Sequence, residues 1–206
     1  MKNILGKPKI IIGAVVTIVI VIVLFAIGVL STAQQKEEVT QQPNLAPRKI
    51  TFAGTKGKPT FSIKLPLGWA KAEDPRVDLL AGSITSEKLP SRQSFTVNIN
   101  AVVDTHPNTL KNFADYQASW KDQMLGQYPS MKFVSDAVKK VNGMDVYVFE
   151  IKNPRPDGAV VWQIQYVFYV NDKYAVVVTG SAPDTSLQKY KNIIELSIES
   201  LDKVAP

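Results

Sequence analysis

Residues 160–180 read VVWQIQYVFYVNDKYAVVVTG, and this stretch decides the fold of the chain. Two runs rich in β-branched and aromatic residues, 160–170 and 173–180, flank the turn dipeptide Asn171-Asp172. Strand-forming runs joined by two turn residues predict a β-hairpin, and the strands of a hairpin pair antiparallel. The stretch therefore predicts an antiparallel sheet.

Polar and apolar residues alternate in the first of these runs and in the segment 93–103. In the run 160–170, Gln163 and Gln165 face one side, and the other side is apolar: Trp162, Ile164, Tyr166, Phe168 and Val170. In 93–103 the two sides are Phe95, Val97, Ile99, Ala101 and Val103 against Thr96, Asn98 and Asn100. A period of two predicts half-buried strands with one face on the core.

The remaining segments predict further strands and two helices. Asn142-Gly143 is a strong hairpin turn between strands 132–140 and 144–152. Other expected strands are 49–53, 60–65 and 77–85.

Two helices are also expected. One helix should begin at Asn108 or Thr109, end at Gly126 and Pro129, and bury this stripe: Leu110, Phe113, Ala114, Gln117, Trp120, Met124 and Leu125. The last helix should begin near Asp184 or Thr185 and bury Leu187, Tyr190, Ile194, Ser197/Ile198 and Leu201. The pattern predicts an α+β domain, an antiparallel sheet flanked by helices.

Residues 10–30 predict a transmembrane helix. They carry no charge, and 16 of the 21 are Ile, Val, Leu or Phe. At ~1.5 Å per residue, a helix of this length spans ~31 Å, which matches the ~30 Å hydrocarbon core of a bilayer. In lipid the backbone must satisfy its own hydrogen bonds, so a helix is expected despite the β-branched residues.

The flanking charges predict the orientation of this helix. Lys2, Lys7 and Lys9 precede it, whereas the first lysine after it is Lys36. The positive-inside bias places the N-terminus in the cytoplasm. We therefore expect a single-pass cell-membrane protein with four parts: a cytoplasmic tail 1–9, the helix 10–30, a flexible linker 31–47 and an extracytoplasmic domain 48–206.

Composition excludes several kinds of chemistry. The chain has 206 residues and no cysteine, so disulfides, thiolate nucleophiles and cysteine metal sites are excluded. The formal net charge is +6, of which residues 31–206 contribute +3, with 21 Lys and Arg against 18 Asp and Glu. That excess is too mild to indicate nucleic-acid binding. We expect no cofactor and no metal.

Three segments resemble one known family. They are 61–69, FSIKLPLGW; the expected helix after Asn108-Thr109-Leu110, with Phe113 and Trp120; and 174–183, YAVVVTGSAP, before a helix with Tyr190. Over residues 58–203 the chain resembles the PsbP/Mog/DcrB-like superfamily. The resemblance implies an αβα sandwich and a binding or assembly role, as in photosystem II extrinsic subunits, a Ran-binding protein and bacterial envelope lipoproteins. The chain departs from those lipoproteins because it has no cysteine to carry a lipid, and it shows no transit features for a photosynthetic role.

Few residues invite a catalytic interpretation. His106 is the single histidine, and of the possible partners only Asp104 is near it in sequence, so we expect an ordinary loop residue. Ser181 lacks the flanking glycines of a nucleophile elbow. Trp69, Trp120 and Trp162 are expected to pack in the core rather than to stack on a ligand. We therefore predict no catalytic residue.

One charge feature has two interpretations. Residues 48–71 contain no acid and six basic residues: Arg48, Lys49, Lys56, Lys58, Lys64 and Lys71. In the first interpretation, these residues lie near the tether and bind anionic headgroups or a wall polymer. The alternative is that they are solvated lysines on turns and edge strands, where lysine discourages aggregation.

These observations lead to a functional expectation with two rivals. The expectation is a non-catalytic, membrane-anchored binding or assembly module of the cell envelope, whose partner is an envelope protein or an anionic lipid or polymer. One rival is an envelope hydrolase that uses carboxylates, since any acids of the chain could meet in space. The other is a sensor that binds a small ligand.

The anchor makes the first testable prediction. Its alternative is cleavage after Ser31-Thr32-Ala33, whose small residues suit signal peptidase, but the apolar run exceeds the ~7–15 residues of a signal peptide. Intact-mass measurement of the membrane fraction should therefore give the uncleaved chain, resistant to salt extraction, with a domain that protease digests on intact cells. A mature chain that begins near Gln34 and washes off with salt would contradict the anchor.

Overall fold

The computed structural model describes residues 44–53, 57–105, 112–127 and 129–204. The predicted tail 1–9 and transmembrane helix 10–30 lie outside these ranges, so the structure does not test them and both stay predictions. None of the helices in the described ranges combines the length and the apolar character needed to cross a membrane.

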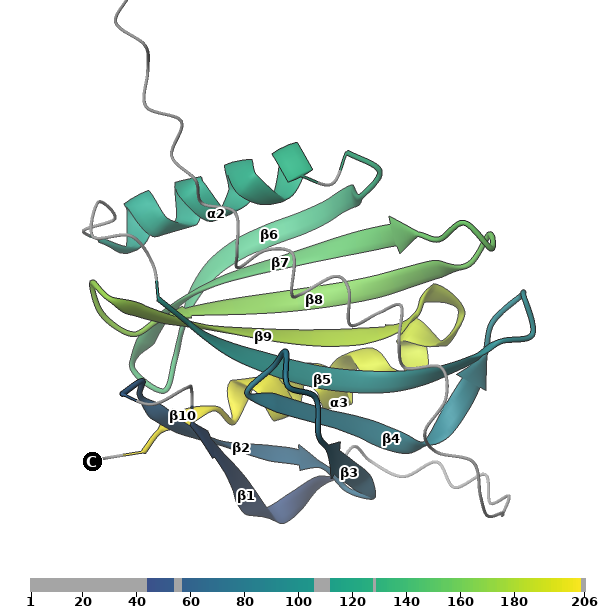
Figure 1. Cartoon of the computed structure of the whole chain (residues 1–206), viewed down its shortest axis with the longest axis horizontal. Helices are drawn as coiled ribbons and strands as arrows, with labels where there is room; N and C mark the ends of the chain where they lie inside the picture. Colours follow the sequence, from purple (N-terminus) through teal and green to yellow (C-terminus); the bar gives the residue numbers. More distant parts are fainter. Residues whose placement is uncertain (1–43, 54–56, 106–111, 128, 205–206) are drawn as a thin grey trace, which may run out of the picture.

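A seven-stranded antiparallel sheet forms the centre of the domain (Figure 1), in the order β3-β4-β5-β9-β8-β7-β6. Its strands are β3 (Trp69–Ala72), β4 (Leu79–Lys88), β5 (Ser94–Thr105), β6 (Lys132–Val141), β7 (Met144–Pro154), β8 (Val160–Tyr169) and β9 (Tyr174–Pro183). The two predicted hairpins are confirmed as β6–β7 and β8–β9. β5 pairs with β9 although they are far apart in sequence, so the three central strands are β5, β9 and β8.

A second, smaller sheet contains β1 (Leu45–Ala53), β2 (Thr60–Pro66) and β10 (Asp202–Lys203). The prediction that the linker extends to residue 47 is wrong, because β1 begins at Leu45, which pairs with Pro66 of β2. β3 and β10 are strands that the sequence did not predict, since both are short and β3 follows the turn at Gly68.

The turn Asn142-Gly143 links the sheet to the last helix. Asn142 has φ 49° and Gly143 has φ 81°, as a type I′ hairpin turn requires. The Asn142 side-chain amide also donates hydrogen bonds to the carbonyl oxygens of Glu199 (3.1 Å) and Leu201 (2.8 Å). These carbonyls lie at the C-terminal end of α3 (Leu187–Glu199), where helix carbonyls lack partners. One turn residue therefore closes a hairpin and caps a helix.

Helix α2 (Phe113–Gln127) packs on one face of the sheet through fewer residues than predicted. Tyr116, Trp120 and Met124 are buried in it, whereas Ala114 and Leu125 of the predicted stripe are exposed. The helix is rotated because Tyr116, which the prediction missed, lies against Trp120 and Tyr169. The predicted N-cap residues lie outside the described ranges; Asn112 accepts the Asp115 N–H at 2.9 Å, as an N-cap does.

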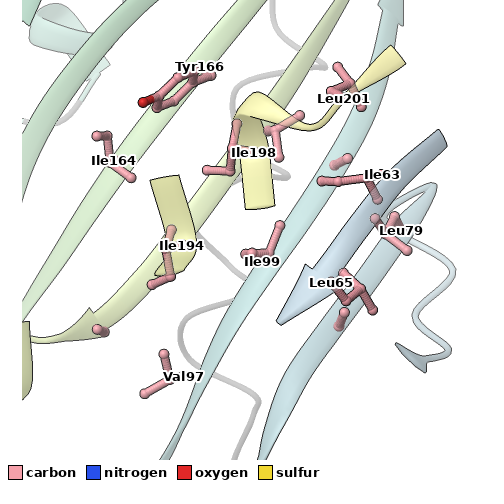
Figure 2. Packing of buried hydrophobic residues seen from close by; sticks show 14 of the residues in the cluster. Ile63, Leu65, Leu79, Val97, Ile99, Ile164, Tyr166, Ile194, Ile198 and Leu201 are labelled. Carbon is pink, nitrogen blue, oxygen red and sulfur yellow. The ribbon is translucent and has the colours of Figure 1, made fainter. Parts of the chain in front are cut away.

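The opposite face carries the main core, covered by α3 and by the small sheet (Figures 1 and 2). The predicted α3 stripe is confirmed, since Tyr190, Ile194, Ser197 and Ile198 are buried. The short 3₁₀ turn Asp184–Ser186 leads into α3. Figure 2 shows Ile194 and Ile198 among side chains of both sheets, including Ile63, Ile99 and Ile164.

The central strands are buried more completely than the alternation predicted. β5, β8 and β9 are buried over almost their whole length, on both faces, so the expectation of half-buried strands is wrong for β5 and β8. On one face they pack on α3, and on the other Val167 and Val177 belong to the apolar cluster of α2.

Gly180 fixes how closely α3 approaches β9. A Cβ atom at this position would lie 2.1 Å from Cγ2 of Ile194 and 3.5 Å from Cγ2 of Ile164. Real Cβ atoms do not come that near, so a side chain at residue 180 would push α3 from the sheet.

Gly180→Ala should therefore lower the free energy of unfolding by about 1–3 kcal/mol, the usual cost of overpacking a core. Gly126→Ala in α2 is the matched control, since its Cβ would meet no described atom within 4 Å. It should be neutral or stabilising by up to ~1 kcal/mol. Denaturant unfolding measures both. Adding Ile194→Ala should cost less in the Gly180→Ala background than in wild type, and strictly additive costs would contradict the contact.

Candidate functional site

The residues that the sequence analysis considered for catalysis form no site in the described part of the chain. His106 lies outside the described residues. Asp104 is 8% exposed at the end of β5. Ser181 is fully buried in β9, where its hydroxyl lies 3.3 Å from the Gln163 amide nitrogen that donates to it. Ser181 is therefore a sheet residue with an amide partner, not an exposed nucleophile.

The three tryptophans pack as predicted. Trp69 is half-buried against the main core, Trp120 is buried under α2, and Trp162 is fully buried in β8. Trp162 has a second role that the sequence did not indicate, because its indole Nε1 donates to Oε2 of Glu150 at 3.0 Å.

The predicted basic patch is spread over several elements. Lys49 and Lys64 are direct cross-strand partners on β1 and β2, and Lys49 forms an ion pair with Asp202. The Lys58 ammonium donates to the Val103 carbonyl at 2.5 Å. Exposed Arg48 lies beside Lys49 on β1, exposed Lys71 lies on β3 in the other sheet, and Lys56 is outside the described residues. Membrane contact by this patch stays a prediction.

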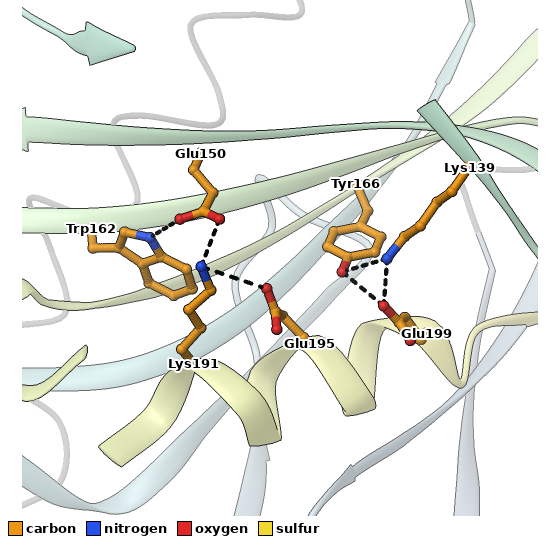
Figure 3. Close-up of polar contacts among 7 residues, drawn as sticks. All are labelled: Lys139, Glu150, Trp162, Tyr166, Lys191, Glu195 and Glu199. Carbon is orange, nitrogen blue, oxygen red and sulfur yellow. Dashed lines mark hydrogen bonds and ion pairs between the residues drawn. The ribbon is translucent and has the colours of Figure 1, made fainter. Parts of the chain in front are cut away.

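A different set of charged residues converges in space. It lies on the α3 side of the sheet, between α3 and the strands β6, β7 and β8, and its members come from four separate elements (Figure 3). We call it the acidic groove: Lys139, Glu150, Trp162, Tyr166, Lys191, Glu195 and Glu199. Its residues fall at helical spacing on α3 and on the core-side register of the strands, which is why distant segments meet here.

One end of the groove joins α3 to β7 and β8. The Lys191 ammonium donates to Oε1 of Glu150 at 2.7 Å, while Trp162 donates to the other carboxylate oxygen. The Lys191 ammonium also lies 5.9 Å from the Trp162 ring centroid, within range of a cation–π contact. Glu150 is thus held by two donors and its side chain is only 16% exposed.

The other end repeats the arrangement with different residues. The Lys139 ammonium, from β6, donates to Oε1 of Glu199 at 2.5 Å and to the Tyr166 hydroxyl at 3.0 Å. The Tyr166 hydroxyl donates to the same Glu199 oxygen at 3.0 Å. Each end therefore combines one lysine, one aromatic ring and one glutamate.

Glu195 lies between these two ends and forms the longest ion pair of the acidic groove. The nearest cation to it among the described residues is Lys191, at 4.0 Å. Glu195 lines a groove of about 140 Å³ together with Lys139, Glu150, Ile164 and Tyr166. Two lysines face three glutamates here, so the fully ionised groove carries one uncompensated negative charge.

The environments of two glutamates shift their pKa values in opposite directions. Burial, together with the nearby negative charges of Glu150 and Glu199, raises the pKa of Glu195 despite Lys191. Burial also opposes ionisation of Glu150, but the hydrogen bonds from Lys191 and Trp162 outweigh it and lower the pKa of Glu150. Burial and the Glu199 charge raise the pKa of the Tyr166 hydroxyl, which stays protonated as a donor.

The acidic groove suits a positively charged organic group better than a metal ion. Within the described ranges no three histidine or acidic side chains lie close enough to hold a metal ion. A positively charged organic group could instead pair with Glu195, whose side chain is 29% exposed in the groove.

Comparison with known proteins bears on the fold. No family model matches the chain, and no curated protein matches its sequence. Among solved structures, LpqN of Mycobacterium tuberculosis, described as involved in cell envelope biogenesis, matches with a TM-score of 0.56 and 14% identity over 77% of this chain and 91% of LpqN. CyanoP, the cyanobacterial PsbP of Synechocystis sp. PCC 6803, matches with a TM-score of 0.51 and 12% identity over 82% of this chain and 98% of CyanoP.

The domain has the PsbP-like fold. This confirms the resemblance inferred from residues 58–203, including the order of strands and helices. At such low identity the likeness shows the shared PsbP-like architecture and assigns no activity.

Sequence reasoning missed the acidic groove because its members are far apart along the chain. The α3 stripe located the buried face, and Lys191, Glu195 and Glu199 fall beside it at four-residue spacing. That spacing was the available signal. It could not indicate that β6, β7 and β8 would bring Lys139 and Glu150 against the same helix.

The opposite pKa shifts predict opposite effects of two matched substitutions. Because the native pKa of Glu195 is raised, its ionised form costs stability at neutral pH, and the cost vanishes below the ordinary glutamate pKa of ~4.3. Because the native pKa of Glu150 is lowered, its ionised form adds stability that is lost as pH falls through that lowered value.

Glu195→Gln should therefore stabilise the domain at pH 7 and Glu150→Gln should destabilise it. Each effect should be about 1 kcal/mol or less, since one pKa unit corresponds to ~1.4 kcal/mol and solvent screens both groups in part. Denaturant unfolding at pH 7 and at about pH 3 measures both, and the differences from wild type should shrink at the lower pH. Destabilisation by both variants at pH 7 would contradict the assignment.

Proposed function

We propose that this protein is a non-catalytic binding module of the cell envelope, anchored by residues 10–30, which binds a partner protein in the acidic groove. The observation that carries the proposal is Glu195, a partly buried carboxylate in an open groove whose nearest described cation is 4.0 Å away. The Glu195 side chain is 29% exposed, so its charge is only partly solvated, and Lys191 compensates it from a distance. A cationic side chain from a partner would supply a closer contact.

The groove offers a specific fit for lysine or arginine. Glu195 provides the charge, while the neighbouring Tyr166 is 1% exposed and its hydroxyl is already bonded to Glu199, so the new contact would be ionic. The existing pairs show the pattern that an incoming cation would repeat, since Lys139 pairs with Glu199 and Lys191 pairs with Glu150. Pairing inside such a groove is less screened than on an open surface.

The fold supports a binding role without assigning one. LpqN is described as involved in cell envelope biogenesis, and CyanoP is described as a cyanobacterial PsbP. The predicted anchor and orientation would hold this domain on the outer side of the cell membrane. The tether would keep the acidic groove within reach of envelope proteins, and Arg48, Lys49 and Lys71 would face anionic headgroups or polymer.

Photo-crosslinking in the cells that make the protein tests this proposal. A photoreactive residue replaces exposed Ala137, which lines the groove, in the full-length chain. The matched control carries it at Leu67, 58% exposed in the turn between β2 and β3. We expect a discrete protein adduct from position 137 alone, which Glu195→Arg abolishes while the domain stays folded by circular dichroism. Identical adducts from both positions, or an adduct that survives Glu195→Arg, would contradict the proposal.

A carboxylate hydrolase is the second candidate. The observation in its favour is that Glu195 and Glu150 share one groove and have pKa values shifted apart, as in a general acid paired with an ionised carboxylate. The two donors on Glu150 oppose it, because they occupy both carboxylate oxygens that a nucleophile or base would need. Release of new ends from an envelope polymer by wild type, but not by Glu195→Gln, would favour this candidate.

A further inference from the structure

Strand β6 is one edge of the seven-stranded sheet, and its outer side pairs with no strand in the described part of the chain. Residues 132–138 of this strand are all exposed. The opposite edge, β3, is only 4 residues long, as sheet edges in soluble proteins commonly are. β6 is 10 residues long and therefore leaves a row of backbone N–H and C=O groups open to another strand.

The lysines in the second half of β6 do not guard this edge. Edge lysines usually project outward and discourage a further strand. The Lys139 ammonium is instead drawn inward, where it donates to Glu199 and to the Tyr166 hydroxyl. Lys140 pairs with Asp145 of β7 at 2.6 Å. Both lysines are thus held by acids of the same domain.

One stretch of β6 is regular enough to receive a strand. A bulge at Val134 shifts the pairing with β7 between Phe133 and Ser135. From Ser135 to Val141 the pairing continues without a further shift. This stretch is longer than the ~5–6 residues of an average strand.

The two faces of β6 differ in chemistry. Ala137 pairs with Val148 of the core under α3, so it lies on the side of the acidic groove, which Ser135 also lines. Val138 pairs with Tyr147 of the apolar cluster under α2, so it lies on the opposite side. The edge is therefore bordered by acids on one face and by apolar side chains on the other.

Exposed apolar side chains gather at this edge. Phe133 is 36% exposed, Val134 is 49% exposed and Val138 is 54% exposed. Leu125 of α2, 46% exposed, lines an apolar pocket together with Phe133. These are four of the eight large apolar side chains that are exposed among the described residues. Such a cluster on an edge strand promotes aggregation unless a partner covers it.

We propose that β6 accepts an added strand from a partner protein, an extended segment with basic residues at alternate positions and apolar residues between them. Alternate side chains of an added strand point to opposite faces of the sheet. Basic residues opposite Ser135 and Ala137 extend over these small side chains toward Glu195, which lines the same groove. The apolar residues cover Val138. This inference rests on the proposed cation site at Glu195 and adds the form of the partner.

A second copy of the chain fits this edge less well. β6 contains the three lysines 132, 139 and 140 and a single acid, Asp136. Antiparallel pairing of two copies, centred on Asp136, would bring Lys132 of each copy near Lys140 of the other. Like charges opposite each other destabilise a sheet, so the charges favour a different protein as the partner.

Hydrogen exchange of the full-length chain in lipid nanodiscs tests the proposal, read by mass spectrometry over residues 132–141. The probe is the peptide acetyl-Thr-Lys-Val-Lys-Val-Lys-Thr-amide, whose length matches the regular stretch of β6. At saturation we expect it to slow exchange in β6 about tenfold, because outward N–H groups gain partners, and to leave the other edge, β3, unchanged. No slowing at millimolar peptide, or equal slowing at both edges, overturns the proposal.

Altered peptides separate the added strand from its charge. One peptide is N-methylated at the valines and another at the lysines. Only one of these sets of N–H groups faces β6, so one peptide should bind about tenfold more weakly or worse and the other like the parent. Equal binding by both overturns strand addition, and if Glu195→Gln still weakens binding, the cation site at Glu195 survives. If a peptide with glutamates in place of the lysines protects β6 equally, the cation site fails and the charge pattern proposed here fails with it.

A variant of the edge itself completes the test. Val138→Lys adds the kind of charge that guards natural edges. Leu67→Lys, at a position 58% exposed in the turn between β2 and β3, is the matched control for net charge. We expect Val138→Lys to abolish the protection of β6 while the domain stays folded by circular dichroism, and Leu67→Lys to retain it. Protection retained in folded Val138→Lys overturns the proposal, as does protection without peptide that rises with protein concentration, which would assign the edge to a second copy.

Discussion

The close approach of α3 to the centre of the sheet, made possible by Gly180, is the constraint on which the rest of the structure depends. Ile194 occupies the space that a side chain at position 180 would fill. With α3 at this depth, its hydroxyls reach the small sheet: Ser197 donates to the Lys64 carbonyl at 2.6 Å, and Ser200 accepts from the Lys64 N–H at 2.8 Å. The same depth brings Lys191 to Glu150 on β7 and Glu199 to Lys139 on β6. One helix thus ties both sheets together and shapes the acidic groove.

The two faces of the central strands have different chemistry. The α3 face is continuous apolar core with ionic pairs at its edge, as expected where burial of apolar area stabilises the fold. On the α2 face an apolar cluster under Tyr116, Trp120 and Met124 borders buried polar side chains of the central strands, among them Asn100 and Gln165. Glutamine and asparagine at the centre of a sheet stabilise it poorly.

The sequence predicted what local patterns determine and missed what tertiary contacts determine. The hairpins at Asn142-Gly143 and Asn171-Asp172 and the stripe of α3 follow from turn chemistry and helical period, and all are confirmed. The alternation in β5 and β8 correctly distinguished two faces. The polar face was expected to contact solvent, because the sequence of a single strand does not show which elements cover it. The α2 stripe was misplaced because Tyr116 packs against Tyr169, which is distant in the chain. The acidic groove could not be predicted because its charged residues come from four elements, β6, β7, β8 and α3, that meet only in the folded domain.

Native-state hydrogen exchange tests most directly whether α3 and the central strands form one cooperative unit. The amides of Ile194 and Ile198 should exchange with the same opening free energy as those of Val176 and Val178 in β9, because separating the helix exposes the core shared by both sheets. Gly180→Ala should lower the opening free energies of helix and strand together. Exchange of the α3 amides through a low-energy local opening, with β9 still protected, would contradict the account.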